Sequence, residues 1–184
     1  MKQLTFEKNQ AFQDHKKRLE HGGSVREGRR KLARPLDVAK AIHLVLRSLK
    51  AKGEWSLLRR RNENKISSLI YTFAAKNNII IHKYGNSGNH LHLLLKAKSK
   101  KEFRRFLKTI TGLIARHVTG AKKGNSKGKF WSSLAYTKLV SVGRHFKNTM
   151  NYVWRNALEG WGVIPPRAEA KGYAKLDFQD LYDW

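Results

Sequence analysis

Hydrophobic residues recur along the chain with two different spacings, and each spacing predicts a different kind of element. Alternation and short apolar runs predict four strands, at residues 40–50, 78–85, 89–97 and 130–142. In the first of these, Ile42, Leu44 and Leu46 lie on one side, as expected for a half-buried strand. The Gly-Asn-Ser-Gly run at 85–88 tolerates positive φ values, so the second and third strands are expected to form a hairpin.

A spacing of three to four residues predicts three amphipathic helices, at residues 62–78, 99–119 and 143–162. Asn62 is a candidate N-cap for the first helix, and Gly160 or Gly162 is expected to end the third. The resulting order is strand, helix, strand, strand, helix, strand, helix. Three helices against one face of a mainly antiparallel sheet make an α+β sandwich, which is the fold class that the pattern predicts.

The composition narrows the class of partner. The 184 residues suffice for one domain with its own core, and 39 Lys and Arg against 13 Asp and Glu leave a net charge of +26. So large a positive charge repels itself unless a polyanion neutralises it, so nucleic acid is the expected partner.

The chain has no apolar run long enough to span a bilayer and no secretory signal, which favours a cytoplasmic, nucleoid-associated protein without a membrane partner. Because the chain has no cysteine, disulfides, thiolate zinc sites and cysteine nucleophiles are excluded.

The two ends of the chain differ in composition from its middle. Residues 1–38 are expected to form a basic arm with a short helix near residues 12–20, and residues 39–162 the folded domain. Residues 163–184 are expected to form a tail in which acidic and aromatic side chains are interleaved. This tail either packs its aromatic rings on the domain or covers the basic surface until a substrate displaces it.

Carboxylates are almost missing from the middle of the chain. Between Asn64 and Leu158 the only one is Glu102. Metal-dependent nucleases usually hold their cations with several Asp or Glu oxygens, and such a cluster cannot be assembled from this stretch. A metal site there would depend on histidine, asparagine and substrate phosphate.

A triplet in the third predicted strand, His90-Leu91-His92, carries candidate metal ligands. Because residues two apart share one side of a strand, Leu91, Leu93 and Leu95 are expected in the core and both histidines on the opposite side. Two imidazoles at this spacing can hold one divalent cation and leave positions open for substrate oxygens. The alternative is that the histidines only occupy a polar sheet face, because such triplets often arise by chance.

The last predicted helix carries two further candidates, Tyr152 and Asn156, one turn apart and about a quarter-turn from its apolar face. Asn156 could supply an oxygen ligand where carboxylates are absent. Tyr152 could attack a phosphorus atom whose oxygens a metal polarises. The alternative for this tyrosine is amphipathic packing with its hydroxyl in water.

Together these residues resemble a known family. Residues 89–94 around the histidine pair, followed by Tyr152-x-x-x-Asn156, are similar to the HUH-type single-tyrosine transposases, in particular the IS200-like branch of REP-associated tyrosine transposases. The resemblance extends over about residues 40–162. It implies a ferredoxin-like βαββαβ core with a mainly antiparallel sheet and a further C-terminal helix that carries the tyrosine.

The resemblance implies a metal-dependent transposase that acts on single-stranded DNA. His90, His92 and Asn156 would hold a magnesium or manganese ion, and Tyr152 would be the nucleophile. Cleavage next to hairpin DNA, such as a REP hairpin, would leave a 5′-phosphotyrosine, and a second strand's 3′-hydroxyl would rejoin the DNA. His43 resembles a first-strand histidine of the family and could face the same site, although we expect it to have a structural role.

Basic side chains outside this site are the expected phosphate contacts, together with one aromatic ring for base stacking. They are Arg26, Arg29, Arg30, Lys31, Arg104, Arg105, Lys108, Lys122, Lys123, Lys127, Lys129 and Trp131.

Two other functions compete with the transposase hypothesis. A non-catalytic, domesticated nucleic-acid-binding protein would explain the charge, but not a tyrosine and an asparagine in register beside two histidines. An HUH replication or mobilisation nickase would share the metal site, although such enzymes tend to be longer. A homodimer is possible, with the active site inside one chain or shared by two.

Overall fold

The structure is a computed structural model that describes residues 19–26 and 33–165. Most of the expected helix near residues 12–20, the arm residues Arg29, Arg30 and Lys31, and the tail from residue 166 onward lie outside the described residues.

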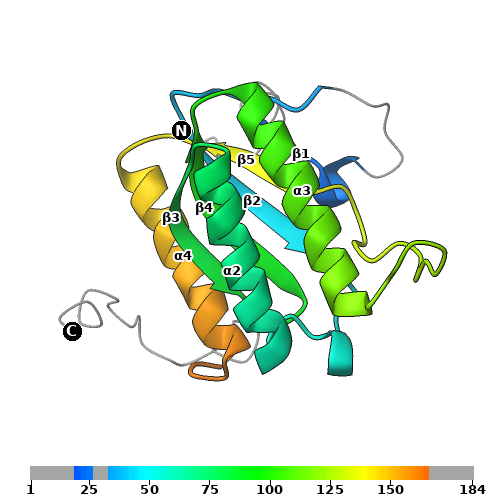
Figure 1. The fold of residues 1–184 in the computed structure, drawn as a ribbon. Coiled ribbons are helices and arrows are strands. Elements are labelled where there is room, and N and C mark those ends of the chain that lie inside the picture. The colour runs from blue at the N-terminus through cyan, green and yellow to red at the C-terminus, as the bar shows by residue number, and fades with distance from the viewer. Residues whose placement is uncertain (1–18, 27–32, 166–184) are drawn as a thin grey trace.

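A single antiparallel sheet forms the centre of the described part of the chain (Figure 1). Its strands are β1 (Glu20–His21), β2 (Ala41–Arg47), β3 (Ile79–Asn86), β4 (His90–Ala97) and β5 (Tyr136–Val140). They lie in the order β1-β5-β2-β4-β3. The pattern of alternating residues therefore predicts β2, β3 and β4 correctly.

Three long helices connect or follow these strands: α2 (Arg60–Lys76), α3 (Lys100–Thr119) and α4 (Arg144–Gly160). Two short 3₁₀ turns, η2 (Gly23–Arg26) and η3 (Gly53–Trp55), complete the elements of the described residues. The sequence from β2 to β5 is the predicted βαββαβ unit, and the α+β class is confirmed. None of these helices is long and apolar enough to cross a membrane.

One face of the sheet holds the main hydrophobic core. Figure 1 shows α2 and α3 side by side in front of the sheet. Ile70 of α2 and Phe106 of α3 pack with Leu44 and Leu93 of the sheet, and all four side chains are fully buried. Burial of side chains of this size is the dominant favourable term in folding, so this layer stabilises the domain.

Helix α4 lies on the opposite face, which corrects the expectation that three helices share one face. Its Phe146 and Met150 pack on a small cluster of Ala41, Leu94 and Val140. The reason lies in the run of leucines at residues 93–95, because consecutive apolar residues in a strand give it an apolar side chain on both faces.

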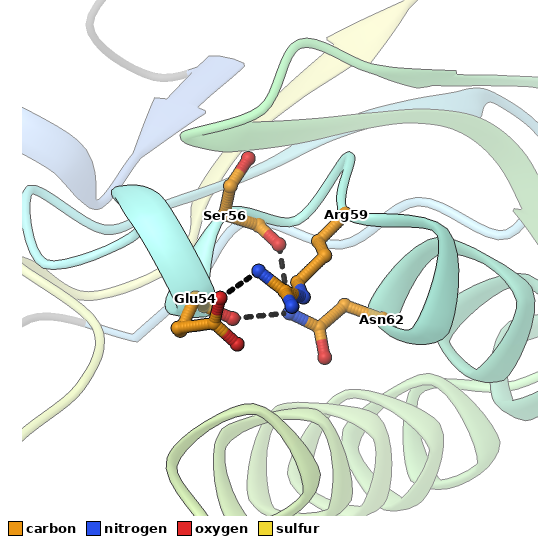
Figure 2. A network of polar contacts seen from close by, with 4 residues as sticks. All are labelled: Glu54, Ser56, Arg59 and Asn62. Atoms are coloured by element: carbon orange, nitrogen blue, oxygen red, sulfur yellow. Dashed lines mark hydrogen bonds and ion pairs between the residues drawn. The ribbon is translucent and has the colours of Figure 1, made fainter.

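Asn62 does not cap α2, contrary to the prediction. The helix begins at Arg60, and Asn62 is fully buried inside its first turn. Its Nδ2 donates to the carbonyl oxygens of Glu54 (3.0 Å) and Ser56 (2.8 Å), as Figure 2 shows, next to the Glu54–Arg59 ion pair. Asn62 therefore fastens the loop between β2 and α2, since its amide satisfies carbonyl groups that this loop leaves unpaired.

The strand predicted at residues 130–142 is shorter in the structure. β5 begins only at Tyr136, because the preceding residues bond to the end of β2: Ser48 Oγ donates to the Phe130 carbonyl (2.6 Å) and Ser132 N to the Arg47 carbonyl (2.9 Å). The buried Phe130 ring anchors this segment in the core.

Part of the predicted basic arm belongs to the sheet. β1 pairs with β5, and Glu20 forms an ion pair with Lys138 at 3.1 Å. Arg34 donates to the Ala135 carbonyl at 2.8 Å and to the Thr137 hydroxyl. Residues before the predicted domain boundary at 39 thus cover the β5 edge.

Candidate active site

Strand β4 presents its two histidines on the sheet face that α4 covers. Leu91, Leu93 and Leu95 are fully buried in the core on the other side, as the alternation predicts. The rings of His90 and His92 lie edge to face with centroids 4.6 Å apart. His92 is buried and His90 is half-buried, so the two imidazoles form a contact pair that is partly shielded from water.

His43 of β2 joins this pair. Its Nε2 lies 3.1 Å from Nδ1 of His92, and the two rings stack with centroids 5.4 Å apart. His43 is itself buried. A ring nitrogen engaged in this way fixes the orientation of the neighbouring imidazole, so the expected structural role of His43 takes a specific form: it holds His92.

All three imidazoles have lowered pKa values, with burial as the largest cause. For His43 the pKa falls to about 4, with further contributions from the nearby charges of Lys138 and His145. For His92 it falls well below its usual value, lowered also by His43 and His90. These groups are therefore neutral at pH 7, which is the form in which imidazole binds a metal.

The nitrogen atoms left over by these contacts fit a divalent cation. Nε2 of His92 is buried and has no hydrogen-bond partner among the described residues. Nδ1 of His90 bonds to Asn89 Oδ1, and the same ring is also hydrogen-bonded to the Asn156 side chain, so a cation bound by His90 would replace that second hydrogen bond. A buried nitrogen without a partner is unfavourable unless something binds it.

The donor set is nevertheless sparse. In residues 19–26 and 33–165 no group of three or more His, Cys, Asp and Glu side chains is arranged to hold a metal ion. A cation here would depend on two imidazoles, a neutral protein oxygen and oxygens of the substrate, a set that suits a site with open positions.

Helix α4 brings Tyr152 and Asn156 to these histidines. The Tyr152 ring meets His92 edge to face at 5.4 Å and His43 at 5.7 Å between centroids, and this tyrosine is 40% exposed. One turn later, Asn156 Nδ2 donates to the Tyr152 carbonyl at 2.7 Å. Burial lowers the pKa of His90, and a hydrogen bond between His90 and Asn156 opposes that shift. The structure thus brings together all four predicted site residues.

A cavity of about 940 Å³ adjoins this cluster and is lined by His43, His90, His92 and Tyr152. Its volume is that of a small-molecule site and exceeds what one phosphate would fill. Arg47 and Lys138 supply cations, Ser132, Ser133 and Thr149 supply hydroxyl groups, and none of the described residues that line it is acidic. Such a lining suits an anionic chain with further polar groups.

A second tyrosine, Tyr136, lines the same cavity. Burial raises the pKa of its phenol, and Glu20 raises it further through its charge and a hydrogen bond. A phenol held in this way ionises with more difficulty. Of the two tyrosines, Tyr152 is the better candidate for a nucleophile, because its ring contacts both His43 and His92.

Comparison with known proteins identifies the family. The family model described as "Transposase IS200 like" matches residues 39–156, a stretch that includes all four site residues. This chain belongs to the IS200-like transposase family. The transposase is therefore connected with DNA transposition by mobile elements, in agreement with the resemblance seen in the sequence.

One solved structure supports the fold of this transposase, and a second is similar to part of it. A REP-associated tyrosine transposase solved with a REP hairpin is 12% identical, with a TM-score of 0.51, over 71% of this chain and 73% of that one. A candidate transposase from Deinococcus radiodurans R1 is 19% identical over 70% of this chain and 98% of that one, with a TM-score of 0.43. A search of curated proteins found no match.

The predicted phosphate contacts on α3 and in the loop that follows it lie apart from the cavity. Arg104, Arg105 and Lys108 are exposed on α3, on the far face of the sheet. Lys122, Lys123, Lys127 and Lys129 are exposed in the loop that follows α3. Of the arm residues, Arg26 lies in η2 without a described side chain.

Trp131 is tied to the core side of the transposase. Its indole Nε1 donates to the Thr111 carbonyl at 2.9 Å, and its ring packs edge to face on Phe130 at 4.9 Å. Only part of this ring is left for base stacking.

Sequence reasoning missed several polar residues of the transposase cavity, notably Arg47, Lys138 and Ser24. The alternation in β2 contains a signal for one of them, because Arg47 shares the face of His43. Lys138 reaches the cavity through the pairing of β5 with β2, and Ser24 through the turn η2 that follows β1, and no local sequence pattern indicates either placement.

Proposed function

We propose that this transposase acts on single-stranded DNA, depends on a divalent metal, and cleaves and rejoins its substrate through a 5′-phosphotyrosine at Tyr152. The observation that carries the proposal is the contact of the Tyr152 ring with the His43–His92 pair in a cavity whose charged residues are cationic. A nucleophile, candidate metal ligands and phosphate-neutralising groups meet at this one place.

The metal-binding residues in this proposal are His90 and His92, with the carboxamide oxygen of Asn156 as the third ligand. Magnesium or manganese bound there would withdraw charge from the scissile phosphate. His43 holds the His92 ring so that Nε2 stays directed to the ligand position. Arg47 adds positive charge around the bound backbone, whereas the charge of Lys138 is partly neutralised by its ion pair with Glu20.

The chemical step is a transesterification. The Tyr152 phenol loses its proton and its oxygen bonds to phosphorus, while the bond from phosphorus to the 3′-oxygen breaks and that oxygen takes up a proton. A 3′-hydroxyl of a second strand then attacks the phosphotyrosine, loses its proton, and returns one to Tyr152. Because each ester replaces another, the cycle needs no nucleotide hydrolysis.

We assign hairpin recognition to the α3 side and the cleavage site to the cavity. The exposed cations of α3 and of the loop at 121–129 would hold the stem phosphates. This loop leads directly to Ser132 and Ser133 in the cavity wall, so a single-stranded extension could follow it from one face of the sheet to the other. The similar REP-associated transposase, described as bound to a REP hairpin, supports a hairpin as the substrate.

The test is a covalent-adduct assay with a labelled DNA hairpin that carries a single-stranded extension, with and without magnesium. Wild type is expected to give a metal-dependent shifted band on a denaturing gel, and Tyr152→Phe is expected to give none while binding the hairpin as wild type does. Tyr136→Phe tests the rival phenol and is expected to form the adduct. Tyr71→Phe, on the opposite face, is the matched control.

The outcomes separate the functions that compete. Tight, salt-sensitive binding without any adduct would point to a non-catalytic binding protein. An adduct that is never resealed onto a second strand would point to a nickase. Retained cleavage by Tyr152→Phe would remove this residue from the mechanism.

We further propose that the protein works on nucleoid DNA in the cytoplasm, with a homodimer as a possible assembly. Mixing Tyr152→Phe with His92→Ala tests how the site is built. Restored adduct formation in the mixture would indicate a site shared by two chains, and a mixture as inactive as its components would indicate a site within one chain.

A further inference from the structure

Helix α4 approaches β3 more closely than an ordinary side chain at the contact would permit. A Cβ atom added at Gly85 would lie 2.6 Å from the carbonyl oxygen of Val153 and 3.2 Å from Val153 Cγ1. The first of these atoms belongs to the helix backbone, so it cannot rotate away. Gly85 does not have a positive φ, and the glycine is therefore required for space and not for backbone conformation.

A second contact of the same kind lies two turns further along α4. A Cβ atom added at Gly160 would lie 2.6 Å from Ser87 Cα and 2.8 Å from the Asn86 carbonyl oxygen, again backbone atoms. Gly160 also lacks a positive φ. Between the two contacts, Ser87 Oγ donates to the Asn156 carbonyl at 2.8 Å. The helix segment with Tyr152 and Asn156 is thus held against the β3–β4 hairpin backbone to backbone.

The β3–β4 hairpin is itself held by hydrogen bonds to the loop that precedes α2. Asn86 is buried, and its Nδ2 donates to the Leu57 carbonyl at 2.8 Å. Leu57 N donates in turn to the Gly88 carbonyl at 2.8 Å. The loop that contains Leu57 is fastened by Asn62 (Figure 2). A side chain added at either glycine would therefore displace the helix more readily than the hairpin.

The first contact connects directly to the site. Gly85 pairs with His92 across the β3–β4 ladder, and Val153 follows Tyr152 in α4. We infer that Gly85 and Gly160 are positioning residues that set how closely α4 lies on the sheet, and thereby set the distance between the Tyr152 phenol and His92. The catalytic consequence of this inference rests on the proposed function.

The competing explanation is that both glycines only fill a tight space and stabilise the fold. The two explanations differ in what they predict at saturating DNA. A displaced nucleophile lowers the rate of adduct formation and leaves hairpin affinity unchanged, because the proposed stem contacts lie on the far face of the sheet. A general loss of stability lowers both.

The experiment uses the full chain with Gly85→Ala and Gly160→Ala. Gly112→Ala is the matched control, because a Cβ added at this other helical glycine meets nothing within 4 Å. Single-turnover adduct formation with the labelled hairpin and magnesium is expected to fall by about 100-fold in both test variants, since misplacement by about 1 Å can cost that much. Hairpin affinity is expected to stay within about twofold, and Gly112→Ala to behave as wild type.

A wild-type rate in either folded test variant would overturn the inference. So would a parallel loss of rate, hairpin affinity and cooperative unfolding, because that result assigns the glycines to stability alone. If Gly85→Ala does not fold, Gly160→Ala in the last turn of the helix carries the test.

A second readout does not depend on the enzymatic activity. The Tyr152 ring lies close enough to His43 and His92 to shift their imidazole NMR resonances, and Tyr152→Leu provides the spectrum without this ring. In Gly160→Ala these resonances are expected to move towards the Tyr152→Leu positions, and unchanged resonances would overturn the inference. If wild type forms no adduct, the proposed function fails while the NMR comparison still decides the positioning role.

Discussion

The two faces of the central sheet differ in what covers them. On one face, large apolar side chains such as Phe103, Phe106 and Leu93 are fully buried between the sheet and the helices α2 and α3. On the other, the apolar cluster under α4 around Leu94 is small, and the neighbouring area carries His43, His90 and His92 beside a cavity. The first face stabilises the domain, and this stability allows the second to keep polar groups in partly buried positions.

The same comparison explains how α4 is held. A helix that buries few large apolar side chains needs another means of docking, and here the backbone contacts at Gly85 and Gly160 supply it. Substitutions on the α4 face should therefore affect chemistry more than stability, and substitutions in the core should do the reverse.

The largest effect is expected for His92→Ala. Adduct formation should fall by at least about 100-fold and should no longer respond to magnesium, while the core on the far face keeps the chain folded. A magnesium titration of the adduct assay measures this, with His82→Ala as a control on the same face but outside the cavity lining. A titration curve like that of wild type would remove His92 from the metal site.

The next effect concerns stability. Phe106→Ala should lower the free energy of unfolding by about 3–5 kcal/mol, because it leaves a cavity in the main core. Met150→Ala, at the smaller cluster under α4, should cost about 2 kcal/mol, the low end of the range for methionine, because this side chain is only partly buried. Urea unfolding of both variants measures the difference, and equal losses would contradict the asymmetry between the faces.

Acid should lower the free energy of unfolding through the buried His43 on the α4 face. The folded pKa of His43 is lowered to about 4 by burial, so between pH 6.5 and pH 4 the unfolded chain binds a proton that the folded chain does not. The contribution of His43 to the free energy of unfolding is therefore fully present above about pH 6.5 and is lost as the pH falls. Between pH 7 and pH 5 this loss is on the order of 2 kcal/mol. His43→Gln should flatten this decline in urea unfolding at the two pH values, and an unchanged slope would argue against His43 as its source.

The smallest effect on chemistry is expected on the outer surface of α3. The combined change of Arg104, Arg105 and Lys108 to alanine should weaken hairpin binding by about tenfold and lower its salt slope by about 2 to 3. Adduct formation at saturating DNA should remain, because these cations lie on the far face from Tyr152. A loss of the single-turnover rate at saturation would break the proposed separation of binding from chemistry.

Local patterns account for most of the elements and for the candidate residues. Alternation alone directs Leu91, Leu93 and Leu95 to the core and both histidines to the other face, because successive side chains in a strand point in opposite directions. The ends of α3 are likewise set by local interactions. At the N-terminus the Ser99 side chain accepts a hydrogen bond from Glu102 N, and at the C-terminus Gly120 adopts a left-handed conformation. The composition likewise points to nucleic acid without any knowledge of the fold.

Other features depend on contacts between residues that are distant along the chain. The His43–His92 contact joins positions 49 residues apart, and the face chosen by α4, the pairing of β1 with β5 and the close approach at Gly85 are of the same kind. The periodicity of a segment predicts only which of its own residues lie on its apolar side and which on its polar side. Which of two apolar surfaces a helix covers, and how closely, is set by the shape and packing of the partner, and that information becomes available only when the strands are assembled.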